Sequence, residues 1–150
     1  MIGFNHVISG VIIGSIAPLP AVPVIALASH FVMDALPHFG KSEVFKPYNK
    51  NFKLLLIFDA LMCFIILGFG LCLIPDKKLA IIAGAFFAAL PDFLWLLEGR
   101  IKWMEKYFWF AKKIQWGEMP DGWTYELIFF ALMVVIFCLL YTSDAADERS

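Results

Sequence analysis

Charged residues are scarce in this sequence of 150 residues, and only three residues are cysteines. Charged residues make up 17% of the chain and hydrophobic residues 61%, and the mean hydropathy is +0.79. This composition excludes an ordinary water-soluble domain and indicates a membrane protein. The formal net charge is only −1, so nothing in the charge balance favours nucleic acid as a partner, and we expect none.

The few cysteines exclude a disulfide framework, and the N-terminus lacks the features of a cleavable signal peptide. Cys63 and Cys72 belong to one apolar run and would lie about 13 Å apart along a helix, which is too far for a disulfide bond. No basic segment precedes the first apolar stretch, which Pro18, Pro20 and Pro23 interrupt. We therefore expect the N-terminal region to be retained as structure.

The C-terminal segment differs in character from the rest. The stretch "CLLYTSDAADE" resembles the conceptual translation of a sequencing-library adaptor. We therefore expect residues 1–137 to form a single membrane-embedded domain and residues 138–150 to be a non-native tail. Without this tail, the 12 basic and 13 acidic residues become 11 and 10, so the domain stays nearly neutral.

Apolar runs and prolines predict the helices. The prolines of "APLPAVP", residues 17–23, predict a break between two short helices at about residues 5–16 and 21–36, which would form a hairpin. Longer apolar runs approach or exceed the length that crosses a bilayer, and they cover residues 54–74, 79–97 and 125–140. The predicted fold is all-α, a polytopic membrane helical bundle with a short N-terminal hairpin and three longer transmembrane helices.

Small residues recur at helical spacing in two of these segments. Gly10 and Gly14 are one turn apart in the first predicted helix, and Gly84 and Ala88 have the same spacing in the run of residues 79–97. Such pairs allow two helix backbones to approach closely. We expect tight packing at these positions.

Basic residues gather on one side of the predicted membrane. If the hairpin begins and ends on one side, the two long loops also lie there and carry nine basic residues, against Lys77 and Lys78 opposite. The positive-inside rule makes the basic side cytoplasmic. We therefore expect a multi-pass protein of the cell (inner) membrane. The nine residues are Lys41, Lys46, Lys50, Lys53, Arg100, Lys102, Lys106, Lys112 and Lys113.

One of these loops mixes aromatic with basic side chains. Residues 101–116 combine their lysines with six aromatic residues, which is typical of an amphipathic helix at headgroup depth. Such a helix could anchor the protein or act as a lid that recognises a lipid headgroup, and both alternatives make membrane lipids a partner. The aromatic residues are Trp103, Tyr107, Phe108, Trp109, Phe110 and Trp116.

Several ionisable side chains interrupt the apolar segments, where each needs a partner or a watery cavity. The predicted topology places five of them at one end of the bundle and at similar depth, about 5–10 Å from the basic side at 1.5 Å per residue. These five are His6, His30, Asp34, Asp59 and Asp92. His38 lies near them in sequence but beyond Pro37, so its direction is less constrained.

This convergence predicts a divalent metal site. His30 and Asp34 are one helical turn apart, so one helix can present both to a single ion. Imidazoles with carboxylates favour zinc, whereas a site richer in carboxylates would suit manganese or magnesium. Asp59 would then be a partner of the ligands or a general base. The alternatives are a metal-free cluster that relays protons, and a structural bundle in which the polar side chains pair with one another.

Three segments resemble the small prokaryotic integral membrane proteins known as membrane-bound metal-dependent hydrolases. They are "NHVISGVIIG", "SHFVMDALPH" and "ALPDFLW", and the resemblance extends over residues 4–126. It implies a hydrolase acting on a phosphoester or lipid-derived substrate at the cytoplasmic face. The metal ligands it implies are His6, His30, Asp34 and Asp92, with His38 as a further candidate.

The resemblance is incomplete after the Leu-Pro-Asp element. Phe93, Leu94 and Trp95 follow Asp92, where the family pattern continues with another acid and a histidine. A later paired histidine element is also missing from the sequence. The chain could therefore be a divergent hydrolase or a relative that keeps the scaffold without the full set of catalytic residues.

Overall fold

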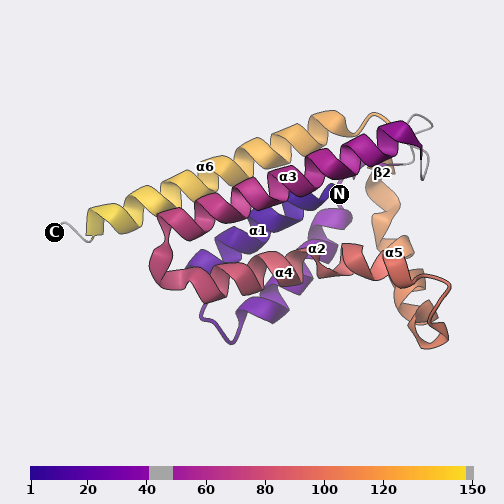
Figure 1. Cartoon of the computed structure of the whole chain (residues 1–150), viewed down its shortest axis with the longest axis horizontal. Coiled ribbons are helices and arrows are strands. Elements are labelled where there is room, and N and C mark those ends of the chain that lie inside the picture. The colour runs from indigo at the N-terminus through magenta and orange to yellow at the C-terminus, as the bar shows by residue number, and fades with distance from the viewer. Residues whose placement is uncertain (41–48, 148–150) are drawn as a thin grey trace.

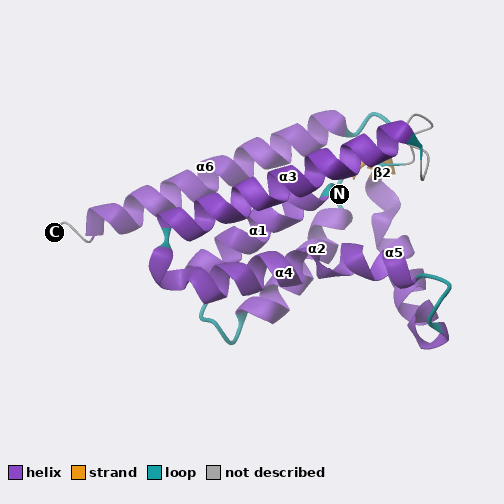
Figure 2. Ribbon diagram, viewed as in Figure 1, coloured by secondary structure: helices purple, strands orange, loops and turns teal. Residues whose placement is uncertain are grey.

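The structure is a computed structural model that describes residues 1–40 and 49–147. Lys41 and Lys46 of the predicted basic loop lie outside the described residues. In the described part the chain is almost entirely helical (Figure 2), which agrees with the predicted all-α class. The α-helices are α1 (Gly3–Ile16), α2 (Val22–Asp34), α3 (Lys50–Leu73), α4 (Lys78–Leu94), α5 (Glu105–Ile114) and α6 (Trp123–Asp147).

Helix α1 is the central element of the bundle. It packs against α2, α3, α4 and α6, most extensively against α4, and its side chains are buried on every side. A helix that is apolar all round is stable only when other elements surround it. The polar residues that α1 does carry, Asn5, His6, Ser9 and Ser15, are therefore buried as well.

The predicted N-terminal hairpin is confirmed. Helix α1 has 14 residues and α2 has 13, and Pro18 and Pro20 lie in the connection between them. Pro23 lies in the first turn of α2, where the missing backbone N–H costs no helical hydrogen bond. Both helices are too short to span the hydrocarbon core of a bilayer alone.

Glycines bring α1 and α4 into backbone contact, as the small-residue spacing predicted. A Cβ atom at Gly10 would lie 2.3 Å from the carbonyl oxygen of Gly84, and one at Gly14 would lie 2.5 Å from the carbonyl oxygen of Ala80. Real side chains do not fit at such distances. These glycines fix how closely the two helices pack, and thereby place the N-terminal part of α1 near the C-terminal part of α4.

Two helices, α3 and α6, are long and apolar enough to cross a membrane. Their apolar side chains are mostly exposed, including Phe64 at 74% and Leu127 at 63%. This exposure is the reverse of what a core helix of a soluble domain has. Helix α4 has 17 residues and then tightens into the 3₁₀-helix η3 (Trp95–Leu97), so two of the three predicted longer helices meet the length of a membrane span.

Residues 101–117, which we call the peripheral segment, cross one end of the bundle, opposite the end where the C-terminus lies (Figure 1). The single amphipathic helix predicted at residues 101–116 is instead divided into η4 (Lys102–Met104), α5 and η5 (Gln115–Gly117). A short parallel pair of strands, β1 (His38–Phe39) and β2 (Glu118–Met119), ties the segment to the end of the hairpin. The sequence did not predict this pair, because two-residue strands have no periodicity.

Candidate metal centre

Three predicted ligands, His6, His30 and Asp34, come together in the interior of the bundle. Each offers one ligand atom, and these atoms lie within 4.8 Å of one another. His6 lies near the start of α1, while His30 and Asp34 lie in the last turns of α2. Their side chains are at most 3% exposed. The hairpin therefore supplies all three, because its turn makes α1 and α2 antiparallel neighbours.

The imidazole of His30 is oriented by α4. Its Nδ1 atom lies 2.7 Å from the carbonyl oxygen of Ala88, and a carbonyl can only accept, so Nδ1 carries a proton. In the neutral tautomer, Nε2 then presents its lone pair. Nε2 lies 3.2 Å from Oδ2 of Asp34. Two acceptor atoms thus face each other unless a metal ion or a further proton lies between them.

The imidazole of His6 stacks on that of His30 and has unused nitrogens. The two ring centroids are 3.9 Å apart with an interplanar angle of 25°. Nε2 of His6 lies 3.2 Å from Oδ1 of Asp34, yet neither ring nitrogen makes a hydrogen bond to the described residues. A fully buried imidazole without hydrogen bonds is costly. An ion bound at Nε2 would satisfy it.

The carboxylate of Asp34 is the centre of the cluster. Besides the two imidazoles, Oδ1 accepts a hydrogen bond of 2.6 Å from the amino group of Met1, and Oδ2 accepts one of 3.1 Å from the Gln115 side chain. Asp34 is therefore contacted from α1, α2 and the peripheral segment. Its negative charge attracts cations, and the Met1 ammonium is one that already lies against it.

Asp92, the fourth predicted ligand, borders the cluster. Its two oxygens lie 4.0 Å from Nε2 of His6 and 3.9 Å from Nε2 of His30. These distances are longer than a hydrogen bond. Its side chain is 35% exposed, so Asp92 lies where the buried cluster meets the surface.

Asp59 of α3 accepts hydrogen bonds from the backbone at the start of α1. Its Oδ1 accepts a 2.7 Å hydrogen bond from the backbone N–H of Phe4, and its Oδ2 one of 3.2 Å from Gly3. These N–H groups belong to the first turn of α1, which has no intrahelical acceptor for them. Asp59 thus caps α1 from a neighbouring helix. Its role as a general base stays a prediction.

His38 is separate from the cluster that the structure assembles. It lies in β1 and is paired in register with Glu118 of β2, and its Nδ1 atom lies 2.8 Å from the carbonyl oxygen of Leu36. Helix α2 ends at Asp34, before Pro37, so His38 does not continue the face of His30 and Asp34. It is not a member of the group formed by His6, His30 and Asp34.

Glu126 of α6 is a buried acid that the sequence did not single out. It is fully buried, and its carboxylate accepts hydrogen bonds from the backbone N–H groups of Ile2 and Phe39 and from the Asn5 side chain. These hydrogen bonds offset the free-energy cost of burying the carboxylate. The signal was available, because an acid inside the apolar run that begins at Tyr125 needs a partner.

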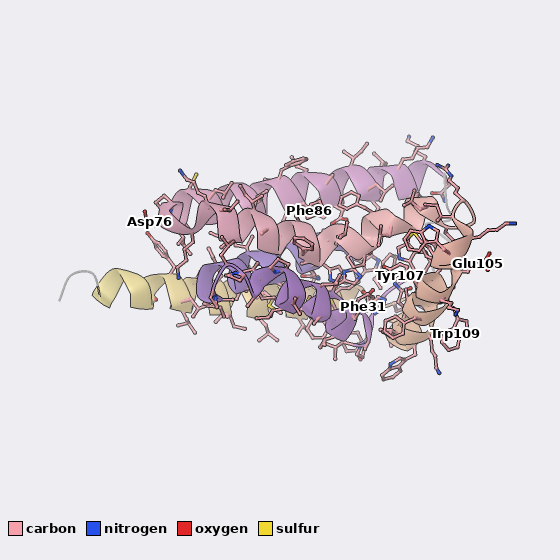
Figure 3. The ribbon with its side chains drawn as sticks, turned by 90° about the horizontal axis from the view of Figure 1, so that it is seen from below. Phe31, Asp76, Phe86, Glu105, Tyr107 and Trp109 are labelled. Atoms are coloured by element: carbon pink, nitrogen blue, oxygen red, sulfur yellow. The ribbon has the colours of Figure 1, made fainter. Side chains whose placement is uncertain are left out.

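The peripheral segment covers this end of the site with aromatic side chains. Phe31 of α2 lies beside Tyr107 of α5 (Figure 3). The ring centroid of Phe31 is 6.4 Å from that of Tyr107 and 5.5 Å from that of Phe110. The Tyr107 hydroxyl donates a 3.5 Å hydrogen bond to the carbonyl oxygen of Pro91. Burial, with the nearby charge of Asp92, raises the pKa of Tyr107 to about 12, so this hydroxyl remains a donor at neutral pH.

Comparison with known proteins gives this chain no relative from which to transfer a function. No family model matches it, and neither does any curated protein or solved structure. The functional argument therefore depends on the geometry of the cluster.

Proposed function

We propose that this chain is an integral membrane protein that binds a divalent metal ion between His6, His30 and Asp34 and uses it to hydrolyse a phosphoester or lipid-derived substrate. The observation that carries the metal site is the facing pair of acceptors, Nε2 of His30 and Oδ2 of Asp34, at 3.2 Å. The contact of Nδ1 with the Ala88 carbonyl supports it. Metal-binding histidines commonly donate their second ring nitrogen to a backbone carbonyl in this way.

Zinc is the ion that these ligands suit best. Two imidazoles with one carboxylate form a known ligand set of catalytic zinc sites, which leave a coordination position open. A zinc ion bound there would supply an activated water molecule or polarise a substrate oxygen. Manganese or magnesium would be favoured only if more carboxylates joined the set. Asp92, which is partly exposed beside both imidazoles, is placed to complete the ligands or to accept a proton.

The membrane setting suggests where the substrate comes from. The exposed apolar faces of α3 and α6 favour insertion of the bundle into a bilayer. The basic loops favour a cytoplasmic location for the end that holds the cluster. A substrate at that membrane face would reach the cluster from the side of Asp92. The hydrolytic reaction itself is supported by the sequence resemblance and by the ligand set.

A non-enzymatic proton relay is the second candidate. The same facing acceptors are satisfied if His30 carries two protons and forms an ion pair with Asp34 across 3.2 Å. The Met1 ammonium against Oδ1 favours a cluster without metal, because it already compensates the negative charge of Asp34. A relay would need no bound metal and would hydrolyse no substrate.

Hydrolysis by the full chain in detergent separates the two candidates. The chain is stripped with a chelator, reloaded with zinc or manganese, and assayed on a diester, a monoester and a phospholipid. We expect metal-dependent activity in the wild type and its loss in His30→Ala and Asp34→Ala. Val24→Ala, which changes a side chain of α2 that is 71% exposed, is the matched control and should keep the activity. Activity that survives both site substitutions would refute the proposed function.

A further inference from the structure

The peripheral segment contributes one side chain to the cluster, that of Gln115 in η5. Its Nε2 atom donates a 3.1 Å hydrogen bond to Oδ2 of Asp34. This is the same oxygen that faces Nε2 of His30 at 3.2 Å. Gln115 lies 81 positions from Asp34 in the sequence, so only the fold brings them together.

The amphipathic pattern of the segment explains why Gln115 points inward. Met104, Phe108 and Ala111 are buried, and Gln115 follows Ala111 by one further helical turn on the same side. Trp109 is 64% exposed on the opposite side, where it points away from the bundle (Figure 3). The buried side of the peripheral segment therefore includes Gln115, whose side chain contacts Asp34.

A second pair of contacts holds the segment in this place. The Tyr107 hydroxyl donates to the carbonyl oxygen of Pro91, one residue before Asp92. The rings of Tyr107 and Phe110 pack on Phe31, one residue after His30. The segment thus contacts the residues that precede Asp92 and follow His30 in the chain. Gln115 contacts a third candidate ligand, Asp34, directly.

We propose that Gln115 is a positioning residue of the metal site. This inference rests on the proposed function. The amide N–H of Gln115 uses one lone pair of Oδ2, as the Met1 amino group uses one of Oδ1. The two contacts fix the plane of the Asp34 carboxylate, so that Oδ1 has a lone pair left for His6 and Oδ2 has one left for His30. A neutral amide does this without adding a charge that would compete with the metal ion. Hydrogen-bond partners that orient metal ligands in this way change metal affinity about 10- to 100-fold.

The test compares Gln115→Met with Trp116→Ala in the full chain. Methionine keeps the length of glutamine but has no N–H donor, and Trp116 is the exposed neighbour at 75%. Zinc affinity is measured by competition with a chromophoric chelator, and the ligand geometry is read from the absorption spectrum of bound cobalt(II). We expect Gln115→Met to bind zinc about 10- to 100-fold more weakly and to change the cobalt spectrum, while Trp116→Ala matches the wild type.

The outcomes separate this role from the metal site itself. If the wild type binds zinc and Gln115→Met binds it equally well with an unchanged cobalt spectrum, the positioning role is refuted and the metal site stands. If the wild type binds neither ion, the metal site is refuted and the positioning role with it. Should Gln115→Met fail to fold, Gln115→Leu, a second side chain without a donor, replaces it and carries the same expectation.

Discussion

His30 and Asp34, one turn apart on α2, face each other across 3.2 Å through two atoms that are both acceptors in the neutral tautomer of the histidine. The geometry follows from the contact of the opposite ring nitrogen with the Ala88 carbonyl of α4. If His30 and Asp34 formed an ordinary hydrogen bond with a neutral ring, Nε2 would carry the ring proton and donate it to Oδ2. The relationship therefore requires either a proton or a metal ion between the two atoms.

Asp59→Ala is expected to destabilise the fold. The substitution removes the acceptor of two N–H groups in the first turn of α1, and loss of a helix cap costs about 0.5–2 kcal/mol. The midpoint of thermal unfolding in detergent should fall, while zinc binding is retained. Hydrolytic activity that disappears at unchanged stability would instead support the general-base role and contradict a purely structural one.

Glu126→Ala is expected to be more destabilising than Asp59→Ala. It leaves the N–H groups of Ile2 and Phe39 and the amide of Asn5 without this acceptor in a buried location. Each buried donor left unsatisfied costs about 1–3 kcal/mol. The control is Leu127→Ala, the next residue, whose side chain is 63% exposed. Equal unfolding midpoints for Glu126→Ala and Leu127→Ala would contradict the structural role of Glu126.

Gly10→Ala and Gly68→Ala form a matched pair that tests the packing of α1 on α4. A Cβ at Gly10 would lie 2.3 Å from the carbonyl oxygen of Gly84, whereas a Cβ at Gly68 would meet no atom within 4 Å. Overpacking costs about 1–3 kcal/mol, and a glycine inside a helix with open space around its Cα gains about 0.5–1 kcal/mol when changed to alanine. The unfolding midpoint should fall for Gly10→Ala and should not fall for Gly68→Ala. Midpoints that change in the same direction would refute the close contact.

His38→Gln is expected to leave metal binding unchanged. The resemblance to metal-dependent hydrolases makes His38 a candidate ligand, but the structure places it in β1 and outside the group of His6, His30 and Asp34. Zinc affinity measured by chelator competition should match that of the wild type. A loss of more than tenfold would mean that His38 reaches the ion and that the arrangement around β1 differs from the one described.

Much of the architecture could be predicted because it depends on local signals. Prolines at positions 18, 20 and 23 break the first apolar stretch, and the small residues of α1 and α4 mark a close crossing. His30 and Asp34 could be paired from their spacing alone. His6 joined them because the predicted hairpin is antiparallel and leaves the start of α1 beside the end of α2.

The remaining features depend on contacts between distant segments, which local patterns do not encode. The sequence gives no sign that Asp59 of α3 caps α1, because a cap on another helix has no fixed spacing from it. In the sequence, Gln115 is one polar residue in an aromatic loop, and its contact with Asp34 arises only when η5 packs on the bundle. Glu126 lies near the start of an apolar run, and the groups that bind its carboxylate, on Ile2, Asn5 and Phe39, are far from it in the sequence.

The metal content of the purified chain tests the central claim most directly. Protein extracted in mild detergent without chelator is analysed by elemental mass spectrometry for zinc, manganese and iron, beside His30→Ala and Asp34→Ala. The account predicts close to one equivalent of a divalent metal in the wild type, with zinc the best fit, and a large loss in both variants. A well-folded wild type that contains no metal, and takes up none when supplied with zinc or manganese, would contradict it.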